Sequence, residues 1–270
     1  MSTPPPTSIL TGRSVHDLRK IKGSKKNKGV RHFLLTRAYS GYKVCIMPRL
    51  ERIAKGNVVY HVFNRANGRL RIFKKQSDFE AFEQILAEGS DRCEMRLCGY
   101  CVMSNHWHLV LWPRKDGDLS EFMKWITVTH SHRWHGAHGT VGLGHLYQGR
   151  FKSFPVQSGA YYLTLMRYVE SNPVRAGIVD RNVDWPWSSL SIRAGEEKAI
   201  VLSDGPEELP RHWVKLVDDT AEIPNHDREL IETCLKRSRP MGKNSWTKRM
   251  AARLRLQSTL RPRGRPRKGV

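Results

Sequence analysis

A pair of apolar segments joined by a two-residue turn constrains the fold of this chain more than any other feature. Residues 93–102 and 106–112 are largely apolar, and Ser104-Asn105 between them is typical of a tight turn. The pattern therefore predicts two antiparallel strands that form a hairpin.

The second strand of this hairpin contains two histidines with one residue between them. Side chains alternate along a strand, so His106 and His108 are predicted on one face, about 7 Å apart along the strand, with Trp107 buried on the other. Two imidazoles on one rigid face are typical of a metal site. The alternative is a half-buried polar face, because this spacing also recurs by chance.

The segments around the hairpin predict more strands and helices. Apolar and β-branched runs favour strands, and apolar residues spaced three and four apart favour helices. Proline at position 173 is expected to end the last helix, since the residue before a proline disfavours helical geometry. The order predicts an α+β fold with an antiparallel sheet. The predicted elements are strand 58–63, helix 77–88 with Ser77 as its N-cap, the hairpin, helix 119–134, strand 150–156 and helix 159–171.

Positive charge is concentrated at the two ends of the chain. The net charge is +22; residues 1–56 hold 13 Lys/Arg and two acidic residues, and residues 236–270 hold 13 Lys/Arg and no acidic residue. Residues 57–235 are therefore close to neutral. A nearly neutral body with basic ends indicates a polyanionic partner, since each neutralised phosphate releases counterions. Solubilising tails are the alternative.

The composition argues against membrane and disulfide-bonded classes of protein. No segment approaches the roughly 18 consecutive apolar residues of a membrane span, and the N-terminus lacks the pattern of a signal peptide. The five cysteines are few and odd in number. Cys98 and Cys101 form a lone CxxC, interpreted as strand cysteines, with metal or redox use as the alternative. We expect a cytoplasmic protein that associates with the nucleoid when it binds DNA.

A tyrosine near the end of the last predicted helix is the candidate nucleophile. Tyr168 and Asn172 are spaced i, i+4, so both are predicted on one helical face. Tyrosine can act as a covalent nucleophile, and a divalent metal can polarise a phosphate that it attacks. The alternative is a core residue with its hydroxyl at the edge. Other candidate nucleophiles, none with a ligand-type residue four positions later, are Tyr147, Tyr161 and Tyr162.

Together these motifs resemble the REP-associated tyrosine transposases, within the single-tyrosine HUH (insertion-sequence transposase-like) superfamily. The resemblance runs from about Val58 to Trp187, and several separated motifs occur in the same order. The motifs are Tyr60-His61-Val62, Asn64-Arg65, His106-Trp107-His108, Tyr147-Gln148-Gly149-Arg150-Phe151, Tyr168 with Asn172-Pro173-Val174-Arg175-Ala176-Gly177, and Trp185-Pro186-Trp187-Ser188.

The resemblance implies a ferredoxin-like catalytic sheet and a metal-dependent tyrosine DNA endonuclease and strand transferase. It implies a divalent ion, Mg²⁺ or Mn²⁺, held by His106, His108 and Asn172. Tyr168 would attack single-stranded or hairpin DNA and leave a 5′-phosphotyrosine and a free 3′-hydroxyl. Some members of the wider class carry glutamine at the position of Asn172, and the shorter side chain reaches less far.

Basic residues within or beside these motifs are candidate phosphate contacts, with a solvated surface role as the alternative. They are Arg65, Arg150, Lys152 and Arg175. His61 is predicted either to approach the site or to fill the core. A second group of histidines at 130, 132, 135 and 138 is scattered around a helix end and loop, which disfavours a zinc site.

The C-terminal segment resembles a small DNA-binding appendage. Helices are predicted near residues 228–236 and, with basic amphipathic character, over 245–256. The last residues contain a Gly-Arg-Pro core similar to an AT-hook, whose Arg263, Arg265 and Arg267 would enter an A·T-rich minor groove; a disordered basic tail is the alternative. The predicted division is a disordered N-terminal extension 1–46, a catalytic domain 47–195, a helical appendage 196–260 and the tail 261–270.

Three functions remain open from the sequence. The first is the transposase. The second is a catalytically inactive relative that binds hairpin DNA, and the third is a hydrolytic metal nuclease of the HNH type, which Ser104-Asn105-His106 weakly resembles but which leaves Tyr168 without a role. Whether the protein acts as a monomer or a homodimer is undecided.

Overall fold

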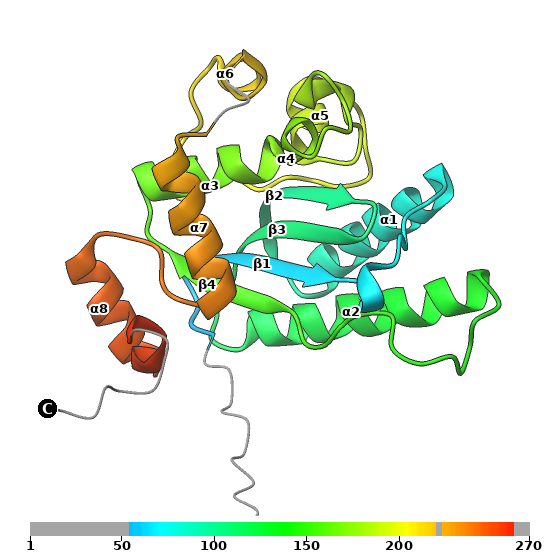
Figure 1. Ribbon diagram of the computed structural model, residues 1–270, viewed down its shortest axis with the longest axis horizontal. Helices are drawn as coiled ribbons and strands as arrows, with labels where there is room; N and C mark the ends of the chain where they lie inside the picture. The colour runs from blue at the N-terminus through cyan, green and yellow to red at the C-terminus, as the bar shows by residue number, and fades with distance from the viewer. Residues whose placement is uncertain (1–53, 220–222, 262–270) are drawn as a thin grey trace, which may run out of the picture. The chain divides into compact units, whose positions relative to one another are not determined.

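The computed structural model describes residues 54–219 and 223–261, and its central feature is a four-stranded antiparallel sheet (Figure 1). The strand order is β2-β3-β1-β4, and every neighbouring pair is antiparallel. Its strands are β1 (Val59–Arg65), β2 (Arg96–Met103), β3 (His106–Trp112) and β4 (Lys152–Val156).

Two helices connect these strands and complete the ferredoxin-like topology. Helix α1 (Gln76–Arg92) leads from β1 to β2, and α2 (Asp118–Ala137) leads from β3 to β4. The order β-α-β-β-α-β, with β3 between β1 and β2, is the split βαβ arrangement. The predicted α+β fold and its hairpin are confirmed.

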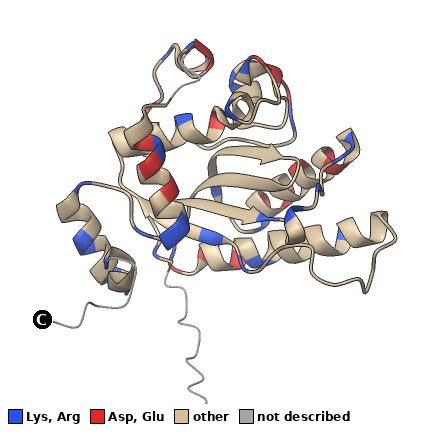
Figure 2. Cartoon of the chain, in the orientation of Figure 1, with Lys and Arg blue, Asp and Glu red and all other residues tan. Residues whose placement is uncertain are grey.

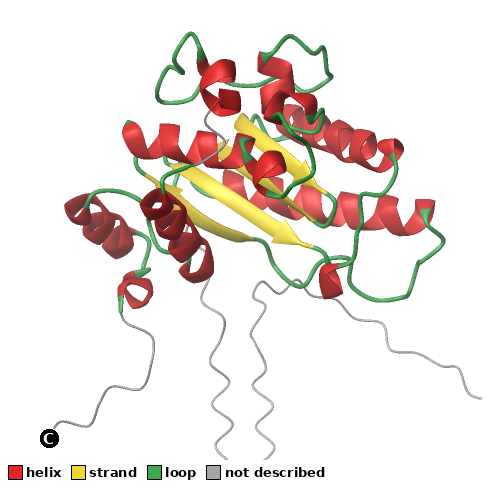
Figure 3. Ribbon diagram, turned by 45° about the horizontal axis from the view of Figure 1, so that its top comes forward, coloured by secondary structure: helices red, strands yellow, loops and turns green. Residues whose placement is uncertain are grey.

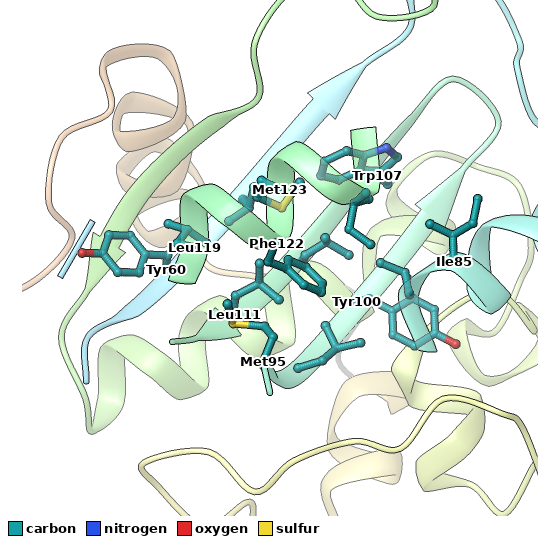
Figure 4. Packing of buried hydrophobic residues seen from close by; sticks show 14 of the residues in the cluster. Tyr60, Ile85, Met95, Tyr100, Trp107, Leu111, Leu119, Phe122 and Met123 are labelled. Carbon is teal, nitrogen blue, oxygen red and sulfur yellow. The ribbon is translucent and has the colours of Figure 1, made fainter. Parts of the chain in front are cut away.

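The two faces of the sheet carry separate apolar cores, with helices on both sides (Figure 3). One core joins the sheet to α1 and α2, and Figure 4 shows Trp107 and Leu111 of β3 beside Phe122 and Met123 of α2. The other joins the sheet to α3 (Ala160–Glu170) and α7 (Asn225–Arg237). Because side chains alternate along β3, Trp107 points into the first core and the flanking histidines point toward the second.

Several boundaries differ from the prediction. Helix α1 begins at Gln76 after Lys75, so Ser77 is not its N-cap. The carboxylate of Asp78 accepts hydrogen bonds from the backbone N–H groups of Lys74 and Lys75, at 2.9 and 3.0 Å, and so supplies the cap in its place. Helix α2 continues three residues beyond its predicted end. Strand β1 continues two residues beyond its predicted end, because Asn64 and Arg65 still pair with β3.

The chain after α3 folds into short helices that contribute to both cores. Met241 forms backbone hydrogen bonds with Pro155 and Gln157, both 2.9 Å long, beside β4, and Ile231 and Cys234 of α7 are buried in the second core. Residues of the predicted appendage therefore share this core, and the division at residue 195 stays a prediction. These elements are α4 (Asn172–Arg175), α5 (Ser189–Arg193), α6 (Trp213–Asp219), α7 and α8 (Asn244–Arg253), with 3-10 turns at Asn182–Asp184 and Gln257–Leu260. A further 3-10 turn, Asn67–Arg69, lies between β1 and α1.

Two predicted segments fall beyond this part of the chain. The N-terminal extension 1–46 and the tail arginines Arg263, Arg265 and Arg267 lie outside the described residues. Within the described ranges, no helix combines the length and apolar character that crossing a bilayer requires.

Candidate active site

Three histidines of neighbouring strands lie together on the second face of the sheet. His61 belongs to β1, and His106 and His108 belong to β3. The ring centroids of His106 and His108 are 5.2 Å apart, and those of His61 and His108 are 5.0 Å apart. The predicted pair therefore shares one face, and His61 joins it because its strand pairs directly with β3.

The hydrogen bonds of this group leave the same nitrogen open on both members of the pair. Nδ1 of His106 lies 2.6 Å from Oδ1 of Asn105, and Nδ1 of His108 lies 2.8 Å from Nε2 of His61. Among the described residues, no hydrogen bond occupies Nε2 of His106 or of His108. Histidine ligands ordinarily have one ring nitrogen held by a neighbour while the other binds the metal. The pair therefore fits a divalent metal.

Burial keeps these imidazoles neutral, which is the form that binds metal. It lowers the pKa of His106 to about 4, with the nearby charge of Arg65 acting in the same direction. It also lowers the pKa of His108 well below its ordinary value of 6.5, and that of His61 to about 3. All three are uncharged near neutral pH.

The candidate nucleophile faces this histidine group. Helix α3 is amphipathic and places Tyr168 against the sheet, with its ring centroid 5.9 Å from that of His108 in an edge-to-face arrangement. Tyr168 is only 8% exposed, so burial raises the pKa of its phenol, while the charge of Arg175 lowers it. The phenol is therefore neutral at rest, and a reaction through it needs help in losing the proton.

The other candidate tyrosines have different surroundings. The hydroxyl of Tyr147 lies 2.9 Å from Nε1 of Trp107 and 2.6 Å from Nδ1 of His130, inside the first core. Tyr162 is buried in the second core. Among the tyrosines in the described ranges, only Tyr168 has a ring contact with His106 or His108.

Asn172 is placed less directly than its spacing predicts. Helix α3 ends at Glu170, the chain turns at Ser171, and Asn172 begins the separate short helix α4 with Pro173 after it. The two residues therefore do not share one continuous helical face. The Oδ1 atom of Asn172 accepts a hydrogen bond of 2.9 Å from Nη2 of Arg175. A carbonyl oxygen has two lone pairs, so one remains for a metal.

Arg175 holds the segment that carries both Tyr168 and Asn172. Its Nη1 donates to the carbonyl oxygen of Tyr168 at 2.8 Å and to Oγ of Ser171 at 2.7 Å, and its guanidinium lies 4.1 Å from the centroid of the Tyr168 ring. Both terminal nitrogens of this guanidinium therefore donate hydrogen bonds to the segment from Tyr168 to Asn172. Its predicted role as a phosphate contact is therefore joined by a structural role that the sequence did not indicate.

The other predicted phosphate contacts lie at the ends of β1 and β4. Arg65 pairs in register with His106, and its half-buried guanidinium lies 5.2 Å from the centroid of the Phe63 ring. Its Nε is buried and has no hydrogen-bond partner among residues 54–219 and 223–261. Arg150 and Lys152 are exposed. In the described part of the chain, Arg65 thus has an unpaired donor beside the histidine pair.

A buried carboxylate that the sequence analysis missed anchors the helix of the candidate nucleophile. Glu170 is fully buried, and its oxygens accept hydrogen bonds from Ser189 at 2.5 Å, Trp213 at 2.6 Å and Arg193 at 3.0 Å. The three donors come from α5 and α6, so the end of α3 is tied to both. Glutamate beside the tyrosine was the only signal for this network in the sequence.

The second histidine group and the CxxC pair have ordinary packing partners. His130 stacks on Phe73 in the first core, and Nε2 of His138 lies 3.2 Å from the Asp78 carboxylate. Cys98 and Cys101 are buried on β2, and burial raises the pKa of Cys98 to about 11. In the part of the chain that the structure describes, no cluster of three His, Cys, Asp or Glu could hold a metal.

Lysine and arginine positions occur on both α7 and α8 (Figure 2). Helix α8 contains Lys248, Arg249 and Arg253 and no acidic residue, whereas α7 mixes both signs of charge. The unbalanced charge of α8 is suited to contact with phosphates.

One family model and two solved structures are similar to this chain. The family model described as transposase IS200 like matches residues 54–172, which include both histidines, Tyr168 and Asn172. A solved REP-associated tyrosine transposase bound to a REP hairpin is 19% identical, with a TM-score of 0.45 over 60% of this chain and 98% of that chain. A candidate transposase from Deinococcus radiodurans R1 is 18% identical, with a TM-score of 0.33 over 42% of this chain and 88% of that chain. No curated protein matches the chain.

Proposed function

Because residues 54–172 match the IS200-like transposase family, which confirms the resemblance drawn from the sequence, we propose that this transposase cuts and rejoins single-stranded DNA through Tyr168. One observation carries the proposal. The Tyr168 ring lies against His108, beside two imidazoles whose Nε2 atoms are uncommitted among the described residues. A nucleophile and a pair of metal ligands thus share one small volume within a single chain.

The reaction is a transesterification at phosphorus. The Tyr168 hydroxyl loses its proton as its oxygen bonds to the phosphorus of a DNA phosphodiester, and the bond from phosphorus to the 3′-oxygen breaks. The 3′-oxygen takes up a proton, and the 5′ end stays on the enzyme as a phosphotyrosine. Attack by another 3′-hydroxyl reverses these steps and rejoins the strand without an added energy source.

The residues around Tyr168 have different proposed roles in the reaction. His106 and His108, with Asn172, would hold Mg²⁺ or Mn²⁺, which when bound polarises the phosphate as a Lewis acid. Arg65 would bind the phosphate, since its Nε is unpaired beside His106. Arg175 orients the tyrosine and the amide through its hydrogen bonds.

The substrate proposed is single-stranded DNA that carries a hairpin, as the resemblance to REP-associated tyrosine transposases implies. The cationic helix α8 and the basic ends of the chain support a polyanionic partner. The predicted tail arginines would add affinity of this kind.

The decisive experiment is formation of a covalent adduct. Labelled hairpin DNA from the flanks of the gene is incubated with the protein and Mn²⁺ or Mg²⁺, and products are separated on a denaturing gel. The wild type is expected to form a protein-linked product that disappears in Tyr168→Phe and with chelator. The matched control is Tyr161→Phe, a partly exposed tyrosine of the same helix, which should keep the adduct.

The competing function is hairpin binding without cleavage. Tight binding of the hairpin without an adduct, with Mn²⁺ and with Mg²⁺, would favour this binding function. Release of a cut strand that is not linked to the protein would favour a hydrolytic nuclease.

A further inference from the structure

A cavity lies on the face of the sheet opposite the histidines. It has a volume of about 430 Å³ and lies between the end of β1, helix α2 and the loop before β4. We call it the α2 pocket, and its lining includes Asn64, Ser120, Lys124, Thr127, Arg150 and Phe151. We infer that the α2 pocket binds one unpaired nucleotide of the DNA next to the hairpin. This inference rests on the proposed function and adds a site to it.

The α2 pocket is close to the candidate active site along β1. Asn64 and Arg65 are adjacent in the strand, and adjacent side chains point to opposite faces. Arg65 pairs with His106 on the face of the active site, whereas Asn64 pairs with Trp107 and lines the pocket. A short single strand that passes around the end of β1 would meet both places.

Backbone hydrogen bonds join the loop that lines the α2 pocket to the end of β1. The backbone N–H of Gln148 donates to the carbonyl oxygen of Arg65 at 3.0 Å, and that of Asn67 donates to the carbonyl oxygen of Leu146 at 2.8 Å. The ring of Tyr147 is fixed by its buried hydroxyl. The loop of the Tyr147–Phe151 motif is thus coupled to β1, which gives this motif a place that catalysis by Tyr168 does not require.

The charge of the α2 pocket suits a phosphate. Lys124 and Arg150 are exposed, and neither forms an ion pair with any residue in the described ranges. No acidic side chain lines the pocket. Glu121, on the same helix, lies instead near Cys93 at the end of α1, where its charge adds to burial in raising the pKa of that thiol. Two unpaired cations at the mouth of a cavity are suited to the sugar-phosphate backbone.

The interior of the α2 pocket offers both donors and acceptors. The Nδ2 atom of Asn64 donates only a long hydrogen bond, of 3.4 Å, to the carbonyl oxygen of Gly149. Oγ1 of Thr127 donates to the Met123 carbonyl at 2.7 Å and keeps its acceptor capacity. Phe151 adds an aromatic ring that packs against the first core. Hydrogen-bonding groups beside an aromatic ring recognise unstacked bases, and the volume matches one small ligand rather than a duplex.

The test is an abasic scan of DNA binding with the full chain. Fluorescence anisotropy is measured on hairpins with short unpaired flanks, each lacking one base, in a Tyr168→Phe background so that cleavage does not interfere. We expect one flanking position at which loss of the base weakens binding at least about fivefold. In Ser120→Trp, which fills the cavity, that sensitivity should disappear.

Further variants keep the test independent of folding. The double variant Lys124→Ala with Arg150→Ala changes only exposed side chains and should weaken binding of the flanked hairpin but not of a flank-free hairpin. Lys115→Glu, an exposed charge change just before α2 and outside the pocket, is the control and should leave the scan unchanged. Equal sensitivity at every position, or a profile that Ser120→Trp leaves intact, would overturn the inference. Failure of the proposed cleavage would appear separately, as an absent adduct with the wild-type protein.

Discussion

The Nε2 atom of His61 on β1 lies 2.8 Å from the Nδ1 atom of His108 on β3, and both rings are buried. One of the two nitrogens must donate and the other accept. If His108 binds a metal through Nε2, its Nδ1 carries the proton and donates to His61. The remaining nitrogen of His61, Nδ1, is buried and has no partner among the described residues, which lowers the free energy of unfolding.

Removing His61 should therefore weaken metal binding. His61→Phe is expected to lower the affinity for Mn²⁺ by roughly 10- to 100-fold, as loss of a hydrogen-bond partner behind a histidine ligand commonly does. Isothermal titration calorimetry measures this directly. His61→Gln keeps an acceptor and should recover part of the affinity, and His132→Phe, an exposed histidine of α2, should not change it. Equal affinities in all variants would contradict the role of His61.

Arg175 should affect the rate of adduct formation rather than the binding of DNA alone. A lysine lacks the planar fork that bonds Tyr168, Ser171 and Asn172 together. Arg175→Lys is expected to slow single-turnover adduct formation by about tenfold or more, since a hydrogen bond to a charged group contributes about 1.5–3 kcal/mol.

The pH dependence separates this role from a purely structural one. The positive charge of Arg175 lowers the pKa of the Tyr168 phenol. Arg175→Gln should therefore move the rise in rate that accompanies ionisation of the phenol to higher pH. Arg114→Lys, an exposed arginine, is the control. An unchanged rate and profile in Arg175→Gln would show that the arginine does not act on the tyrosine.

Glu170 should contribute strongly to stability. Its fully buried carboxylate forms an ion pair of 3.0 Å with Arg193, and removing one partner of such a pair commonly costs about 3–5 kcal/mol. Glu170→Gln should lower the free energy of unfolding in urea by roughly this amount. Glu88→Gln breaks a surface pair with Arg133 and should cost less than about 1 kcal/mol. Similar losses in the two variants would contradict the importance of this network.

Stability should fall as the pH is lowered below about 6.5. Burial lowers the pKa of His61 and His130 to about 3 and that of His106 to about 4, while the unfolded chain keeps values near 6.5. Between these values the unfolded state binds more protons, so protonation favours unfolding by up to about 1.4 kcal/mol per pH unit for each histidine. Urea unfolding of the metal-free protein at pH 7.5, 6.0 and 5.0 measures this. A constant free energy over that range would refute it.

The sequence determined the parts of the fold that depend on local pattern. The strand hairpin with His106 and His108 on one face follows from the two-residue period of side chains along a strand, and the sheet's two-sided burial follows from the alternation around Trp107. The resemblance to transposases likewise followed from ordered local motifs. Helix ends were less predictable, because the cap of α1 depends on Asp78 rather than on the favoured residue Ser77.

Which distant residues meet at the candidate site depends on long-range packing. His61 joins His108 because β1 pairs with β3 across 47 positions of sequence, and no local period encodes such a pairing. The position of Asn172 after the end of α3, and the bonds of Arg175 and Glu170, likewise depend on helices that come together only when the second core forms. Local pattern fixes which face a side chain takes, whereas long-range burial and hydrogen bonding fix what it faces.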